Sequence, residues 1–320
     1  MITNEKISII IPTYKGEKSL SLLIEILIKN FPDFEIVIVN DRSPDNTDLI
    51  CKELIKKFEK FSIIYLRLAK NFGEHSAVLA GLSECRGDIA VVIDDDFQHP
   101  ISEIKKIVNY TKNNDFDVVY TKFKKKKHSL IRNLGSMIND KTTNYLLKKP
   151  KNLYLSSFKS IKRNIINELI KSKSSEPYID AIIIKSTSNI GQVLTDHFER
   201  DEKYGKSSYN FKKLISLYLS IFFGYSTAPL RILLVSGVII FLISLFFSFY
   251  IFIEKIINPS LPIGYTSLII ITSLFGGLNF IFIGLIGEYL GKIMNNSNQV
   301  LPYLIEKKIT SHNLNLKYEE

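Results

Sequence analysis

Residues 90–100 combine a short apolar run, three consecutive carboxylates and a proline. The run from Ala90 to Ile93 is typical of a buried strand in a parallel sheet, and Asp94, Asp95 and Asp96 follow it directly. Ligands of open α/β sheets lie at the carboxyl ends of strands, where a hard cation takes carboxylate and phosphate oxygens. Because alternate residues of a strand share a face, Asp94 and Asp96 are the natural pair for Mg²⁺ or Mn²⁺. A solvated acidic turn is the alternative on spacing alone.

Residues 1–205 alternate short apolar runs with amphipathic stretches. This order predicts an α/β domain, Rossmann-like, with a mostly parallel sheet and helices on both faces. The expected strands cover 7–11, 35–39, 63–68, 89–93 and 117–120, and the expected helices cover 19–30, 46–60, 76–84 and 101–113.

Two long uncharged runs follow this domain, over 232–253 and, after a turn, over 265–287. About 22 residues at 1.5 Å each suffice to cross a hydrocarbon core of about 30 Å. Basic residues flank the outer ends of the two runs, so the positive-inside rule places both termini and the front domain in the cytoplasm. A buried helical hairpin in a soluble protein is the alternative. The expected divisions are a juxtamembrane amphipathic segment at 206–229, a transmembrane hairpin at 230–290 and a cytoplasmic tail at 291–320.

The formal net charge of +10 suits anionic partners, which include nucleic acid, acidic lipid and phosphorylated substrates. Two cysteines, Cys51 and Cys85, give neither a disulfide framework nor a metal-ligand spacing. The histidines His75, His99 and His128 share no metal spacing either, and are assigned no role.

Two basic features lie between the expected sheet and the expected spans. The stretch 129–147 reads as an interfacial amphipathic helix, although a core-facing helix would show a similar pattern. The lysine-rich run 122–127 could attract anionic head groups or an acceptor phosphate, or form a solvated loop. Arg132 is a further candidate phosphate contact.

Polar residues follow the first two expected strands. Asp41 lies at the mouth of the second strand, where a nucleoside would rest in such a sheet. Helix capping alone would explain its neighbours Ser43, Asp45 and Thr47. The chain has neither G-x-G-x-x-G nor a Walker sequence, which excludes an ordinary dinucleotide fold and a P-loop NTPase.

Taken together, a set of ordered motifs resembles family 2 glycosyltransferases of the GT-A fold, in particular the polyprenyl-phosphate branch. That branch includes undecaprenyl-phosphate sugar transferases and dolichyl-phosphate mannose synthases. The resemblance covers roughly residues 6 to 292, and it departs from the family pattern at Lys15-Gly16, Asn40, Lys70 and Ser208. The motifs are Ile9–Tyr14, Val39–Thr47, Lys70–Gly73, Gly87–Asp88, Asp94–Gln98, His197–Tyr209 and Gly287–Gly291.

The resemblance implies a role for each matching position. Asp41 would bond the base edge of the donor, and Asp94 and Asp96 would bracket the cation, with Asp96 the likelier direct ligand. The implied catalytic set is Asp94, Asp96, Gln98 and Arg200; the donor set is Pro12, Tyr14, Asp41, Lys70 and Asp95; and the acceptor or membrane-proximal set is Arg132, His197, Ser207 and Tyr209.

The implied reaction is an inverting, metal-dependent transfer of sugar from a nucleotide sugar, expected to be a UDP-sugar, to undecaprenyl phosphate. The implied partners are the donor, the polyprenyl phosphate and the bilayer, with no nucleic acid; glycines in the second span would also allow contact between subunits of a homo-oligomer. The expected location is the bacterial cytoplasmic membrane. Two alternatives stay open: transfer to a lipid-linked saccharide or polymer, and a non-catalytic scaffold or flippase subunit. The sequence does not indicate which sugar is moved.

Overall fold

The structure is a computed structural model that describes residues 5–123, 153–172, 174, 177–195 and 301–311, with scattered positions between 246 and 293. Two compact units form the chain. The first combines Met1–Asn210 with Gln299–Glu320, and the second is Phe211–Asn298. The interfacial helix expected at 129–147 and most of the segment 206–290 lie outside the described residues.

An eight-stranded sheet with the order β7-β5-β6-β4-β1-β2-β3-β8 forms the centre of the first unit. Its middle strands β4, β1, β2 and β3 are parallel, as the alternation of strands and helices predicts. They are built from β-branched, fully buried runs such as Ile9–Ile11, which fits strands covered on both faces. The strands are β1 (Ile7–Thr13), β2 (Glu35–Asn40), β3 (Ile63–Leu68), β4 (Ile89–Val92), β5 (Val118–Phe123), β6 (Lys159–Lys162), β7 (Ile190–Thr195) and β8 (Ile305–Thr310).

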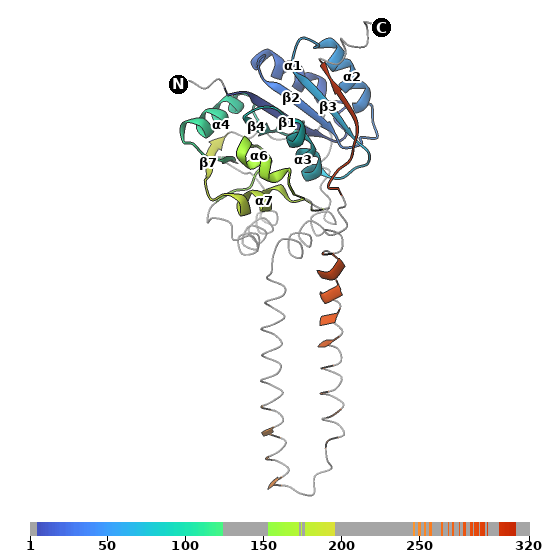
Figure 1. Ribbon diagram of the computed structural model, residues 1–320, viewed down its shortest axis with the longest axis vertical. Coiled ribbons are helices and arrows are strands. Elements are labelled where there is room, and N and C mark those ends of the chain that lie inside the picture. The colour runs from blue at the N-terminus through green and yellow to red at the C-terminus, as the bar shows by residue number, and fades with distance from the viewer. Residues whose placement is uncertain are drawn as a thin grey trace. The chain divides into compact units, whose positions relative to one another are not determined.

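Helices cover both faces of this sheet (Figure 1). The strand alternation separates two cores: Ile9 and Ile11 pack with α1, α2 and α4, whereas Ile10 packs with α3, α6 and α7. The described helices are α1 (Leu20–Asn30), α2 (Thr47–Lys57), α3 (Glu74–Glu84), α4 (Ser102–Asn113), α6 (Arg163–Leu169) and α7 (Ile179–Ser186).

The sheet is mostly rather than wholly parallel. Strand β6 is antiparallel to both β4 and β5, and β7 is parallel to β5. The strand expected at 117–120 corresponds to β5, whereas β6 and β7 were not predicted from the sequence. Both of these strands contain polar residues and are short or partly exposed, so neither has the continuous apolar run of the middle strands.

Part of the C-terminal tail belongs to the same sheet. Strand β8 pairs antiparallel with β3, and the red strand in Figure 1 shows this position. Ser311 stabilises the end of β8 against β3. The Ser311 hydroxyl donates to the Phe61 carbonyl at 2.7 Å and accepts from the Ile63 amide at 3.3 Å. The tail expected at 291–320 therefore supplies an edge strand to the first unit.

Among the residues that the structure describes, no helix has the length and apolar character that crossing a bilayer requires. Most residues of the spans predicted at 232–253 and 265–287 lie outside that set.

Candidate active site

The carboxyl ends of β1, β2 and β4 meet at one edge of the sheet. Strand β1 lies between the other two, with Thr13 opposite Asn40 and Ile10 opposite Val92. The turns that follow these strands are therefore neighbours. The Thr13 hydroxyl donates to Asp95 at 2.5 Å, and the Lys15 amide donates to the Ser43 hydroxyl at 3.0 Å.

Close packing at this edge explains the departure at Lys15-Gly16. A Cβ atom at Gly16 would lie 2.2 Å from the Thr13 hydroxyl oxygen and 2.8 Å from an Asp95 carboxylate oxygen. Lys15, just before it, adopts a left-handed conformation with φ of 64°. A larger residue at position 16 would displace the link between Thr13 and Asp95, so this chain needs a glycine there.

The Asp94 carboxylate is held by two side chains from different parts of the sequence. Its Oδ2 accepts a hydrogen bond from the Ser157 hydroxyl at 2.6 Å and lies 2.9 Å from His99 Nε2. Burial raises the pKa of Asp94, but its hydrogen bonds to His99 and Ser157 and the nearby charges of His99 and Lys159 outweigh it and lower that pKa. Asp94 is therefore an ionised, oriented carboxylate at neutral pH.

Asp96 lies in a tight turn directly after this carboxylate. Its side chain is buried and accepts the Gln98 amide at 3.1 Å, while Phe97 between them is left-handed with φ of 60°. Strand β4 ends at Val92, so regular strand alternation does not extend to Asp94 and Asp96. The expectation that Asp94 and Asp96 bind a cation together was based on that alternation. Their joint binding of a cation stays a prediction.

Asp41 joins two of the sequence motifs. It is almost fully buried, and its two carboxylate oxygens accept the amides of Phe72 at 2.7 Å and Gly73 at 2.8 Å. Gly73 has φ of 95°, a conformation that favours glycine. A carboxylate oxygen can accept more than one hydrogen bond, so this structural role is compatible with a contact to a nucleobase.

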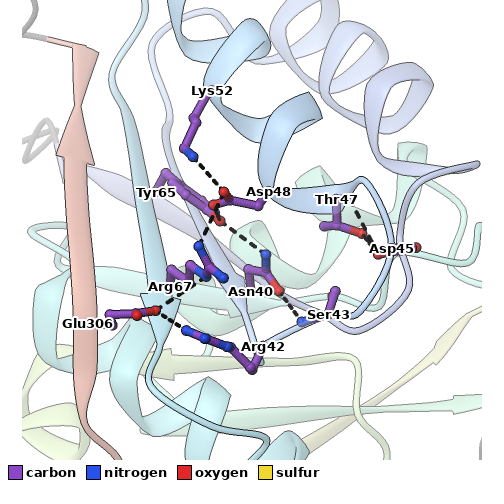
Figure 2. Close-up of polar contacts among 10 residues, drawn as sticks. All are labelled: Asn40, Arg42, Ser43, Asp45, Thr47, Asp48, Lys52, Tyr65, Arg67 and Glu306. Carbon is purple, nitrogen blue, oxygen red and sulfur yellow. Dashed lines mark hydrogen bonds and ion pairs between the residues drawn. The ribbon is translucent and has the colours of Figure 1, made fainter.

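A series of hydrogen bonds, each with a defined donor and acceptor, links the loop after β2 to β3 and α2 (Figure 2). The Asn40 amide nitrogen donates to the Tyr65 phenol at 3.0 Å, and Tyr65 donates to Asp48 at 2.6 Å. The Asn40 amide oxygen accepts the Ser43 amide at 2.8 Å. Asn40, which departs from the usual family pattern, thus serves as a donor and an acceptor at once, which an ionised aspartate could not do.

Helix capping explains the contacts of Ser43, Asp45 and Thr47 only in part. The N-cap residue of α2 is Asn46, which makes no side-chain cap hydrogen bond. Instead, Asp45 accepts the Thr47 hydroxyl at 2.6 Å and the Thr47 amide at 3.3 Å. Ser43 binds Lys15 of the neighbouring turn rather than the helix. All three side chains therefore have structural partners, and Figure 2 shows Asp45 and Thr47 beside the start of the helix.

The motif Gly87–Asp88 lies at the opposite edge of the sheet, before β4 begins. The Gly87 amide donates to the Ser8 hydroxyl at 2.8 Å, and a Cβ atom on Gly87 would lie 2.6 Å from the Ser8 backbone nitrogen. Asp88 accepts the Lys6 amide at 2.9 Å. This motif keeps the start of β1 against β4 and takes no part in the candidate site.

The comparison with known families decides the assignment of the chain. The family described as glycosyl transferase family 2 matches residues 8–170, which is half of the chain. The chain belongs to glycosyl transferase family 2. It is a glycosyltransferase, as its sequence motifs predicted.

Relatives of this glycosyltransferase match it nearly end to end. An undecaprenyl-phosphate 4-deoxy-4-formamido-L-arabinose transferase of Proteus mirabilis is 29% identical, over 98% of this chain and 97% of that protein. A putative glycosyltransferase, CsbB, of Bacillus subtilis is 28% identical, over 94% of this chain and 91% of that protein.

The solved structures support the fold of the family 2 domain. Glucosyl-3-phosphoglycerate synthase of Mycobacterium tuberculosis was crystallised with Mn²⁺, UDP-glucose and phosphoglyceric acid. It superposes with a TM-score of 0.50 at 13% identity, over 68% of this chain and 77% of that chain. At this identity the likeness shows the fold alone. The predicted GT-A type α/β domain with a mostly parallel sheet is confirmed.

The oxygen donors of the turn after β4 fit a cation that is shared with a substrate. Within the described ranges, no cluster of three or more His, Cys, Asp or Glu residues could hold a metal ion by itself. Mg²⁺ and Mn²⁺ instead bind through one or two carboxylates, with water and substrate phosphates as the other ligands. The aspartates of this turn offer a donor set of that kind.

Two residues of the candidate site were not found by sequence reasoning. His99 was assigned no role, yet its buried ring lies against the Asp94 carboxylate. Ser157 lies 63 residues from Asp94 and carries no local signal. The antiparallel register of β4 and β6, with Val92 opposite Lys159, brings it there. The predicted residues Arg132, His197, Arg200, Ser207 and Tyr209 lie outside the described residues.

Proposed function

We propose that this glycosyltransferase transfers a sugar from a nucleotide sugar, a UDP-sugar in the first instance, to undecaprenyl phosphate with inversion at the anomeric carbon. The observation that carries the proposal is the shared edge of the sheet, where the turn after β1 contacts both the acidic turn after β4 and the Asp41 loop after β2. Ligands of open α/β sheets bind at such an edge. The near full-length similarity to an undecaprenyl-phosphate transferase supports the choice of acceptor.

The donor nucleotide would lie over the loops after β1 and β2. Tyr14, just after β1, is 37% exposed at this edge and offers an aromatic face, and Pro12 is the last but one residue of β1. The Lys70 ammonium lies 4.9 Å from the centroid of the Phe72 ring, next to the segment that Asp41 holds. Together with Asp41 and Asp95, these residues form the proposed donor side.

Asp94 and Asp96 are the proposed ligands of a divalent cation, Mg²⁺ or Mn²⁺. When bound, such a cation neutralises the charge that develops on the departing diphosphate. His99 and Ser157 hold the Asp94 carboxylate in one orientation, and the Gln98 amide holds Asp96. Side chains that hold metal-binding carboxylates set the geometry of the ligands.

The acceptor requires little proton transfer. A phosphomonoester has a second pKa of about 6, so it is largely ionised at pH 7. Its oxygen attacks the anomeric carbon while the bond from that carbon to the donor diphosphate breaks, and the nucleoside diphosphate leaves. A single displacement of this kind inverts the anomeric centre. The proposed acceptor side consists of the cationic Arg200 and Arg132, together with His197, Ser207 and Tyr209.

Two properties of the second unit support its proposed insertion in the membrane as a hairpin. The chain leaves the first unit before Phe211 and re-enters it after Asn298, so an even number of crossings is needed to return to the same face. The large apolar side chains described there are widely exposed, which marks a surface for lipid or for another apolar partner. Examples are Phe246 at 76%, Ile257 at 69% and Leu268 at 64%. The proposed location is the bacterial cytoplasmic membrane, with the catalytic domain and both termini in the cytoplasm.

A lipid-extraction assay tests the proposal. The full-length protein in detergent or vesicles is supplied with a panel of labelled nucleotide sugars, undecaprenyl phosphate and Mn²⁺ or Mg²⁺. The expected product is a labelled, acid-labile phospholipid, absent when the cation is chelated. Label found only in a saccharide would indicate transfer to a lipid-linked saccharide or polymer. No label with any donor would favour the scaffold or flippase subunit.

A further inference from the structure

We propose that Glu306, on the C-terminal strand β8, is a positioning residue for the nucleotide-sugar donor and acts through Arg42. The inference rests on the proposed function, because it takes the loop after β2 to be the donor loop. It assigns a role in the donor site to a tail segment that follows the proposed membrane hairpin.

Glu306 occupies an irregular position in β8. Arg67 pairs with Lys307 and Leu68 pairs with Ile305, so the register shifts and Glu306 lies between the two paired positions. The Leu304 carbonyl then accepts the Ala69 amide at 2.9 Å, which continues the pairing past the irregularity. Bulges of this kind re-aim one side chain and are over-represented beside active sites.

The re-aimed carboxylate joins two arginines of the catalytic sheet (Figure 2). One oxygen of Glu306 forms an ion pair with Arg42 and lies 3.3 Å from Arg67 Nε. Arg67 is in turn 3.3 Å from Asp48, which accepts the Tyr65 hydroxyl. The tail therefore connects to the same hydrogen-bonded chain that supports the loop after β2.

Arg42 is the residue of that loop with the least favourable backbone. Its φ of 55° is left-handed, a conformation that a non-glycine residue keeps only where its surroundings enforce it. Asp41 on one side is fixed by Phe72 and Gly73, and Ser43 on the other by Asn40. The described contact that fixes the Arg42 side chain comes from Glu306.

The pair is exposed enough that its effect on donor binding is separable from its effect on folding. The side chains of Arg42 and Glu306 are 40% and 43% exposed, and exposed ion pairs contribute little to global stability. The conformation of the Arg42 backbone, however, sets the direction of the adjacent Asp41. Loss of the pair should therefore weaken donor binding and leave the folded domain intact.

The test compares Glu306→Gln with Lys308→Met in the full-length enzyme. Lys308 lies on the same strand and pairs with Glu84 at the end of α3, away from the donor loop, so it is a matched control. We expect Glu306→Gln to raise the KM for the nucleotide sugar about threefold to fivefold, the upper range for an exposed pair. The kcat, the KM for undecaprenyl phosphate and the melting temperature should stay at wild-type values, as should all four quantities for Lys308→Met.

A double-mutant cycle tests whether Glu306 acts through Arg42. If it does, Arg42→Gln raises the donor KM, and adding Glu306→Gln raises it no further. If the increases in donor KM of the two single variants multiply in the double variant, the inference is overturned. A wild-type donor KM in Glu306→Gln would overturn it as well. If wild-type enzyme transfers no sugar to undecaprenyl phosphate, the proposed function fails first. Direct titration of the variants with UDP, by calorimetry, then still tests the loop, and equal affinity in Glu306→Gln and wild type would overturn the inference.

Discussion

The side-chain amide of Asn40 donates a hydrogen bond to the phenol of Tyr65, and both residues are fully buried. Tyr65 donates its single hydroxyl proton to Asp48, so its oxygen can only accept the hydrogen bond from Asn40. Burial and the hydrogen bond to Asp48 raise the pKa of Tyr65, so the phenol is protonated at neutral pH. An asparagine at position 40 is therefore matched to Asp48.

The first prediction is that Asn40→Asp destabilises the protein. The new carboxylate at position 40 would have no proton to donate to the Tyr65 oxygen, and Tyr65 already donates its only proton to Asp48. The carboxylate would also be fully buried. The cost of such an unpaired buried charge is about 2 kcal/mol or more. Thermal unfolding of the full-length protein in detergent should show a melting temperature several degrees below that of wild type.

Asp48→Asn provides the control for this substitution. In the double variant, the asparagine at position 48 can donate to Tyr65, and Tyr65 can donate to the carboxylate at position 40. The double variant should therefore melt at a higher temperature than the sum of the two single shifts implies. If the two shifts in melting temperature simply add, the direction of the hydrogen bonds between Asn40, Tyr65 and Asp48 does not matter for stability.

The second prediction concerns Ser157, which holds the Asp94 carboxylate at 2.6 Å. Ser157→Ala should reduce kcat about tenfold, in the range found for residues that hold metal-binding groups. Steady-state rates at saturating donor, acceptor and Mn²⁺ measure this change. Ser160→Ala is the matched control, because Ser160 is buried and bonded to Thr111 instead. An unchanged kcat in Ser157→Ala would remove the positioning role of the hydroxyl.

The third prediction is that Asp96→Asn reduces turnover by about 100-fold or more, the size of effect expected when charge stabilisation in a transition state is lost. Circular dichroism should show a folded protein. Asp115→Asn is the comparison, because the Asp115 side chain is 93% exposed and pairs with Lys162. Wild-type turnover in Asp96→Asn would contradict the metal role proposed for this residue.

The middle of the fold and the edge at which the candidate site lies were predictable from the sequence for a local reason. Parallel strands covered on both faces need continuous apolar runs, and these are visible at Ile9–Ile11 and Ala90–Val92. Such strands place their polar turns at one edge. The prediction that Asp41 and the acidic turn share one edge follows from these two facts, and the parallel register confirms it.

What the sequence did not reveal depends on contacts between distant segments. The bond from Ser157 to Asp94 spans 63 residues, and the ion pair of Glu306 with Arg42 spans 264. Strand β8 has a mixed charged and apolar pattern that also fits an exposed tail. Its place in the sheet comes from pairing with β3. The left-handed Phe97 likewise carries no sequence signal, since it is neither glycine nor asparagine.

The fourth prediction is a loss of stability between pH 7 and pH 5 that depends on His75. Burial, with a smaller contribution from Lys159, lowers the pKa of His75 from its ordinary 6.5 to about 4, against the opposing effect of Asp180. The unfolded state therefore binds a proton that the folded state does not, and stability falls as the pH drops from 6.5 towards 4. From pH 7 to pH 5 the expected loss is about 2 kcal/mol.

His75→Phe isolates this contribution, since it keeps an aromatic ring against Tyr178, whose ring centroid lies 4.8 Å from that of His75. The melting temperature of wild type should fall by several degrees from pH 7 to pH 5, and that of His75→Phe should fall by less. The buried Asp180 does not interfere, because its pKa is lowered and its contribution is lost only below the ordinary value of 3.8. Equal pH dependence in the two proteins would show that the folded state does not hold His75 as a neutral side chain.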